Sequence, residues 1–81
     1  MNFDGLIQRI NKALEDRGIF VDNIEYVKKD KYNFLEIVLD KVGGINLDEI
    51  VEVTSIINQI VDEEDSIKEK YILDISSKER G

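Results

Sequence analysis

The sequence predicts an α+β fold, a two-layer sandwich with the element order α-β-β-α-β and two helices on one face of a three-stranded sheet. Three observations lead to this class. Residues 3–17 carry apolar side chains at helical spacing, and residues 19–40 contain two strand-like segments. Residues 43–77 open with a glycine pair and a helix cap and close with a third alternating segment. Two amphipathic helices cover only one face of such a sheet, so the other face is expected to stay open.

The first helix is expected over residues 3–17. One side of it is apolar, formed by Phe3, Leu6, Ile7, Ile10, Ala13 and Leu14. Gly18 follows, at the position where a left-handed residue commonly ends a helix.

The next two elements are strands over residues 19–28 and 32–40. The first is rich in β-branched residues, and the second alternates Leu35, Ile37 and Leu39 with other side chains. Because only a short polar turn separates them, the two strands should form an antiparallel hairpin.

A second helix is expected from Asn46 to about residue 61. Gly43 and Gly44 permit a sharp reversal before it, and Asn46 with Glu49 has the spacing of a capping box. The helix should end before most of the acidic run at 62–65, because the macrodipole disfavours carboxylates there. Its apolar arc is wider than the usual stripe of ~100°. We expect this arc to pack against the first helix; the alternative is a partner surface along Val53, Ile56 and Ile60.

A third strand is expected over residues 71–76. A right-handed crossover would make it parallel to the second strand. It could then pair beside the first strand, although the sequence leaves the strand order open. The open sheet face is either a docking surface or an ordinary half-exposed face. It would carry Glu25, Val27, Phe34, Glu36, Val38, Ile72 and Asp74.

Composition limits the classes of function. The 81 residues correspond to one domain, and the absence of cysteine and histidine removes disulfides, thiolate chemistry, Cys/His zinc sites and the commonest general acid–base side chain. We therefore expect no catalytic residues, no metal and no cofactor. The net charge of −7 favours basic partners over nucleic acid for the chain as a whole. Without an apolar run long enough to cross a bilayer or a signal sequence, the expected location is the cytoplasm, with no membrane contact.

One local exception to the acidic charge is the turn between the first two strands. Lys28, Lys29 and Lys31 lie there beside Tyr26 and Tyr32. This combination is compatible with a weak RNA contact through the three lysines, and also with a simple charged hairpin turn.

Three segments together resemble the amino-terminal domain of the ribosome maturation factor RimP family: residues 21–28, 39–49 and 71–77. The resemblance implies a non-enzymatic factor that binds the immature small ribosomal subunit, through contact with a basic ribosomal protein, and helps it mature. It assigns residues 1–77 to the RimP-like domain and 78–81 to a polar tail, without the small β-barrel domain that follows in the family. Binding, or shaping of the binding loop, is expected at Glu25, Asp40, Gly43, Gly44 and Asp48.

The alternative function is a structural or protein-interaction domain that associates with itself. The wide apolar arc of the second helix or the open sheet face would then pair with a second copy. We expect a monomer, which a measurement of mass in solution would distinguish from this alternative.

Overall fold

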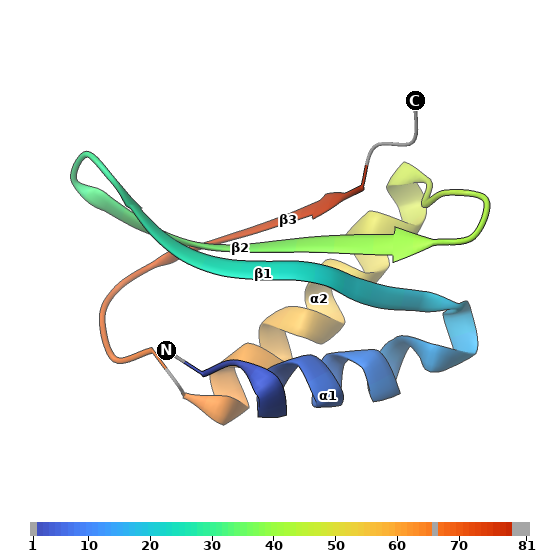
Figure 1. Cartoon of the computed structure of the whole chain (residues 1–81), viewed down its shortest axis with the longest axis horizontal. Helices are drawn as coiled ribbons and strands as arrows, with labels where there is room; N and C mark the ends of the chain where they lie inside the picture. The colour runs from blue at the N-terminus through green and yellow to red at the C-terminus, as the bar shows by residue number, and fades with distance from the viewer. Residues whose placement is uncertain (1, 66, 79–81) are drawn as a thin grey trace.

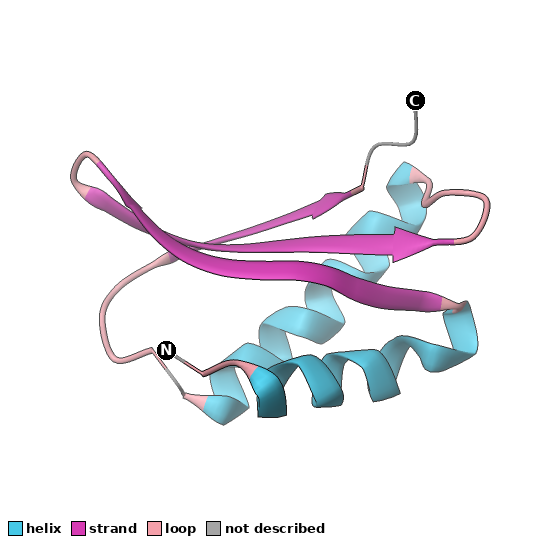
Figure 2. Cartoon of the chain, viewed as in Figure 1, coloured by secondary structure: helices cyan, strands magenta, loops and turns pink. Residues whose placement is uncertain are grey.

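The computed structural model describes residues 2–65 and 67–78, and its elements follow the predicted order. The three strands form one sheet, and both helices lie against the same face of it, as Figures 1 and 2 show. The fold is therefore the predicted two-layer α+β class. The elements are α1 (Asp4–Leu14), the short 3-10 turn η1 (Glu15–Arg17), β1 (Ile19–Lys29), β2 (Tyr32–Lys41), α2 (Leu47–Glu64) and β3 (Ile72–Ser77).

The first helix ends as the sequence predicted, with one local change. Its last three residues tighten into η1, and Gly18 then takes a left-handed conformation with φ +71°. The Gly18 N–H donates to the carbonyl of Glu15 at 3.0 Å. Leu6, Ile10 and Leu14 are buried and form the inner stripe of α1.

The sheet has the order β1-β2-β3. β1 and β2 form the predicted antiparallel hairpin, and β3 is parallel to β2, also as predicted. β3 lies beside β2 and not beside β1. At the free edge of β1, the Val21 N–H donates to Asn11 Oδ1 of α1 at 2.8 Å, so this donor is not available to a third strand.

The core lies between the sheet and the two helices. Leu35, Ile37 and Leu39 of β2 are fully buried, as their alternation predicted. Val53 and Ile60 of α2 are also buried, so the wide apolar arc packs against both α1 and the sheet. This confirms the preferred explanation for the buried part of the arc. Val53 and Ile60 are buried and Ile56 is half-buried, so these three side chains do not form an exposed partner surface.

The end of α2 differs from the prediction. The helix continues through Glu64 and ends at Asp65, a left-handed residue with φ +47°. Arg9 of α1 forms ion pairs with Glu63 and Glu64, and this cation offsets the unfavourable position of the two carboxylates in the last helical turn. Neither helix, over the described residues, is long and apolar enough to span a bilayer.

The last strand ends at Ser77, and the Lys78 N–H donates to the carbonyl of Leu39 at 2.7 Å. The rest of the predicted polar tail, residues 79–81, lies outside the described residues.

Candidate partner-binding surfaces

The loop between β2 and α2 turns at two glycines. Gly43 and Gly44 have φ values of +87° and +90°, a region that residues with a side chain rarely adopt. Lack of space is not the reason, because an added Cβ would meet nothing within 4 Å at either position. The Gly44 N–H donates to the carbonyl of Lys41 at 2.9 Å and closes the turn. Both glycines therefore shape the loop.

The predicted capping box is present at the start of α2. Asn46 Oδ1 accepts from the Glu49 N–H at 2.8 Å, and Glu49 Oε1 accepts from the Asn46 N–H at 3.2 Å. The Lys41 ammonium donates to the other Glu49 oxygen at 2.6 Å. This hydrogen bond, followed by that from Asn46, lowers the pKa of Glu49 below its ordinary value. A carboxylate thus already occupies the helix N-terminus.

Three apolar side chains project into solvent around this loop. Val42, Leu47 and Val51 are 86%, 83% and 71% exposed, more than any other large hydrophobic residue in the described ranges. Leu47 and Val51 are four residues apart, so they lie on the same face of α2. Asp48, also exposed, directly follows Leu47 in the first helical turn. We call Val42, Leu47, Asp48 and Val51 the loop patch.

The sequence prediction missed Leu47 and Val51 as exposed residues. Both were counted in the apolar arc of the second helix, which is wider than the two surfaces that it covers. The excess width of the arc was the feature in the sequence that could have revealed this. Apolar residues of α2 that contact neither α1 nor the sheet must be exposed to solvent.

Asp40, at the end of β2, is buried. Its Oδ1 accepts from the Lys41 N–H at 2.8 Å, so the carboxylate holds the chain where the strand leads into the loop. The burial assigns Asp40 to the shape of the loop more than to direct contact with a partner.

The open sheet face carries an acidic row. Glu25 of β1 pairs with Glu36 of β2, which in turn pairs with Asp74 of β3. Like charges directly opposite one another on a sheet are destabilising. Lys29 relieves part of this repulsion, with its ammonium 3.1 Å from Glu36. Beside the acidic row, Val27, Phe34 and Ile72 form an apolar row in the same register.

The family model of the RimP N-terminal domain matches residues 9–78. The chain belongs to this family. The match confirms the resemblance seen in the sequence, and it spans both strands of the hairpin, α2 and β3. The RimP family consists of ribosome maturation factors.

In this RimP N-terminal domain the predicted binding residues fall into two groups. Four of them surround the β2–α2 loop. Glu25 lies away from this loop. It is opposite Glu36 in the β1–β2 pair, and Glu36 is four residues from Asp40 along β2, or about 13 Å at the usual strand rise. The loop group consists of Asp40, Gly43, Gly44 and Asp48.

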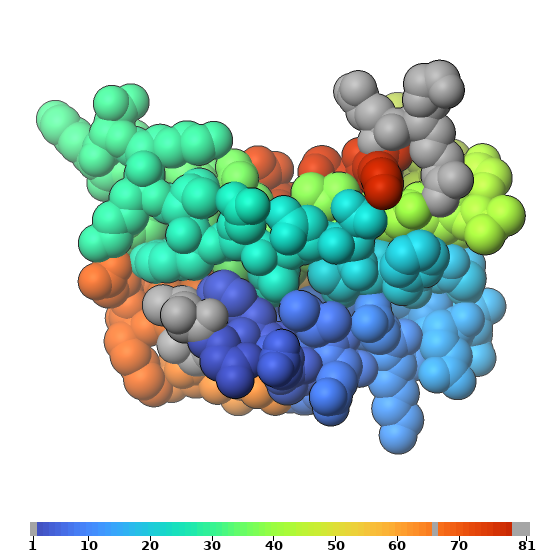
Figure 3. Space-filling view, viewed as in Figure 1, coloured from blue at the N-terminus to red at the C-terminus, as the bar shows by residue number. Residues whose placement is uncertain are grey.

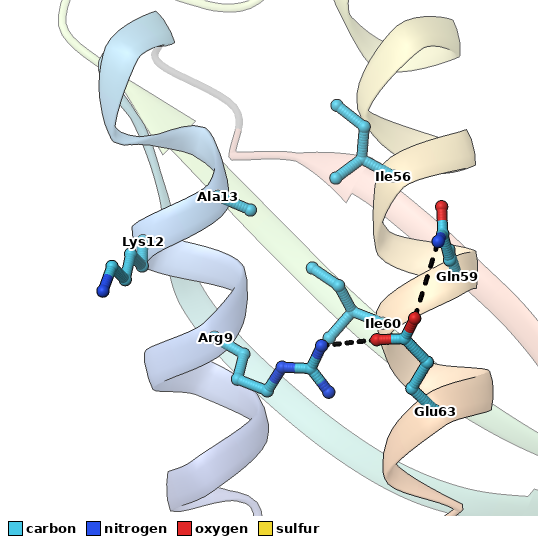
Figure 4. A pocket seen from close by; sticks show the side chains of 7 residues that line it. All are labelled: Arg9, Lys12, Ala13, Ile56, Gln59, Ile60 and Glu63. Atoms are coloured by element: carbon cyan, nitrogen blue, oxygen red, sulfur yellow. Dashed lines mark hydrogen bonds and ion pairs between the residues drawn. The ribbon is translucent and has the colours of Figure 1, made fainter.

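The RimP N-terminal domain also has a groove between its helices, shown in Figure 4. The groove has a volume of about 370 Å³, with Ile56 and Ile60 along α2. Arg9 reaches across from α1 to Glu63, and Gln59 donates to Glu63 at 3.5 Å. The contact with Arg9 lowers the pKa of Glu63, while hydrogen bonds to Glu63 and then Glu64 raise that of Arg9.

The Arg9–Glu63 ion pair crosses this groove and joins α1 to α2. Within residues 2–65 and 67–78, no group of three or more Asp or Glu side chains could hold a metal ion.

Proposed function

We propose that this domain binds the immature small ribosomal subunit, by contacting a basic ribosomal protein at the loop patch, and assists its maturation without catalysing a reaction. The observation that carries the proposal is the exposure of Val42, Leu47 and Val51 beside Asp48 at one end of the molecule. The role implies a cytoplasmic location.

Burial of such exposed apolar side chains against a partner is favourable, because it removes apolar surface from water. Interfaces commonly combine a few such anchors with a polar rim. Asp48 supplies negative charge at this rim, and the net charge of −7 steers a cationic partner toward the domain. A basic ribosomal protein can supply both an apolar contact for these side chains and positive charge opposite Asp48.

The test is co-sedimentation of the domain with purified small-subunit precursors at low salt. We expect the double variant Leu47→Ser/Val51→Ser to bind about tenfold more weakly or worse, because it removes two anchors of the loop patch. Both side chains are exposed, so the fold should be kept, which circular dichroism checks.

A charge variant and a matched control complete the design. Asp48→Lys should also weaken binding, whereas Asp4→Lys should not. The two aspartates each lie in the first turn of a helix, so their replacement has a similar cost through the macrodipole. If the wild-type domain stays in the supernatant, or if both loop-patch variants sediment like the wild type, the proposal is wrong.

The same exposed residues could instead pair with a second copy of the chain. Sedimentation-equilibrium mass measured over a wide concentration range separates the two functions. A constant monomer mass supports binding to a different partner, and a mass that rises with concentration and falls in Leu47→Ser/Val51→Ser supports self-association.

A further inference from the structure

Lysine side chains gather at the end of the sheet opposite the loop patch. Lys28 and Lys29 end β1, and Lys31 lies in the turn that follows. Lys70 joins them from the segment before β3, because Asn33 Nδ2 donates to the Lys70 carbonyl at 3.2 Å. In Figure 3 the tip of the hairpin projects from one end of the molecule, and all four lysines are exposed.

The ion pairs at this end leave two of the four lysines available. Lys29 pairs with Glu36 at 3.1 Å, and Lys28 lies 3.9 Å from Glu69. Over the ranges that the structure describes, Lys31 and Lys70 form no ion pair. The nearby acid Glu69 accepts hydrogen bonds from Tyr26 and Asn33, each at 3.1 Å.

Between these two lysines lies a hollow of about 380 Å³. Tyr32, on its wall, is 60% exposed, so its ring is accessible to a ligand. The volume falls within the range of ~300–1,000 Å³ found for small-ligand sites. We call this feature the hairpin hollow. Its lining residues are Lys31, Tyr32, Asn33, Lys70, Tyr71 and Ile72.

We infer that the hairpin hollow binds single-stranded RNA, with a base stacked on the Tyr32 ring and backbone phosphates held by Lys31 and Lys70. Flexible single strands present bases that stack on exposed aromatic side chains, and lysines supply the contacts to phosphate. A rigid duplex keeps its bases stacked inside and cannot place one in a hollow of this size. An acidic peptide would use the lysines but not the exposed ring.

The inference rests on the proposed function for the source of the RNA, which would be the precursor of the small subunit. It also changes the sequence-based expectation. The weak RNA contact predicted for Lys28, Lys29 and Lys31 is reassigned in part, because Lys29 pairs with Glu36 at 3.1 Å and Lys28 lies 3.9 Å from Glu69. Lys70, which is 39 positions from Lys31 in the chain, takes their place beside the ring.

The test uses a fluorescein-labelled oligouridylate of twelve nucleotides and measures its fluorescence anisotropy with the 81-residue chain at several salt concentrations. We expect Tyr32→Leu to weaken binding about 5- to 150-fold, which corresponds to the usual loss of one stacked base, and Tyr32→Phe to bind like the wild type. The double variant Lys31→Gln/Lys70→Gln should reduce the slope of log K against log salt by about 1.4, or about 0.7 for each phosphate contact. Lys12→Gln, on α1, should change neither quantity.

A tryptophan reporter gives a second measurement. The chain contains no tryptophan, so Tyr32→Trp introduces a single indole whose fluorescence a stacked base should quench. Quenching by oligouridylate supports the inference even if Tyr32→Leu is unstable.

Two outcomes would overturn it. One is the absence of any anisotropy change or quenching at low salt. The other is equal binding of a twelve-residue polyglutamate with the same sensitivity to Tyr32→Leu, which would point to an acidic protein partner. Neither outcome bears on the loop patch. That surface is tested separately, by co-sedimentation of Leu47→Ser/Val51→Ser, and this variant leaves the hairpin hollow unchanged.

Discussion

Gly44 illustrates a residue that is required for its backbone alone. Its φ of +90° lies where an L-residue is strained, and no neighbouring atom would obstruct a side chain. Gly5 is the opposite case. It lies within the helix α1, has no positive φ and has equally open surroundings.

This contrast gives a matched pair of substitutions. Gly44→Ala should lower the free energy of unfolding by about 1–3 kcal/mol through backbone strain. Gly5→Ala should raise it by up to about 0.5 kcal/mol, because alanine loses less conformational entropy in a helix and Gly5 lies in the first turn. Urea denaturation measures both. A neutral Gly44→Ala would show that the loop relaxes away from the positive φ, and would remove the structural explanation for this glycine.

At the scale of elements, both ends of α2 depend on contacts with other parts of the chain. The start combines a local capping box with the ammonium of Lys41, which comes from β2. The end depends on Arg9, more than fifty positions away. The capping box of Asn46 and Glu49 was predictable because it depends on their spacing in the sequence. The contact of Arg9 with the end of α2 was not, because it depends on the tertiary fold. The prediction therefore found the N-cap of the helix and placed its last residue about three positions too early.

The charge at the start of α2 makes stability depend on pH. Because the pKa of Glu49 is lowered in the folded chain, its ionised form stabilises the fold above the unfolded pKa of about 4.3. That contribution is lost as the pH falls through the lower folded value. Glu49→Gln keeps an oxygen acceptor for the cap but removes the charge.

We therefore expect the difference in unfolding free energy between the wild type and Glu49→Gln to be largest near pH 6 and to shrink below about pH 4. Urea titrations at several pH values measure it. Lys41→Gln should reproduce the effect and add little in the Glu49→Gln background, since both changes break the same contact. A difference that is constant with pH would contradict this account.

At the scale of the whole molecule, the sequence predicted the class, the order of elements and the inner face of β2, all of which follow from periodicity. It left open the place of β3, because the choice between the two edges of the hairpin depends on tertiary packing that periodicity does not encode. Asp40, Gly43, Gly44 and Asp48 were predicted from the resemblance to the family, whereas the exposure of Leu47 and Val51 was not predicted. The hairpin hollow was found only in part, since Lys70 and Tyr71 reach Lys31 and Tyr32 through the tertiary fold.

The two proposed contact surfaces lie at opposite ends of β2, which runs from Tyr32 at the hairpin to Lys41 at the loop. Nine residue steps at about 3.3 Å each separate them by roughly 30 Å. Sites more than ~10 Å apart that share no partner usually contribute additively to free energy.

We expect the losses in affinity for small-subunit precursors caused by Tyr32→Leu and by Leu47→Ser/Val51→Ser to multiply in the combined variant. Each surface would then hold a separate part of the particle, RNA at the hairpin hollow and protein at the loop patch, and removing one contact would leave the other intact. Competition binding of the three variants measures the two separate losses and their product. A combined loss that differs from this product by more than about 0.5 kcal/mol would mean that the surfaces act together, for instance by closing on one ribosomal element, and the assignment of two separate partners would then be wrong.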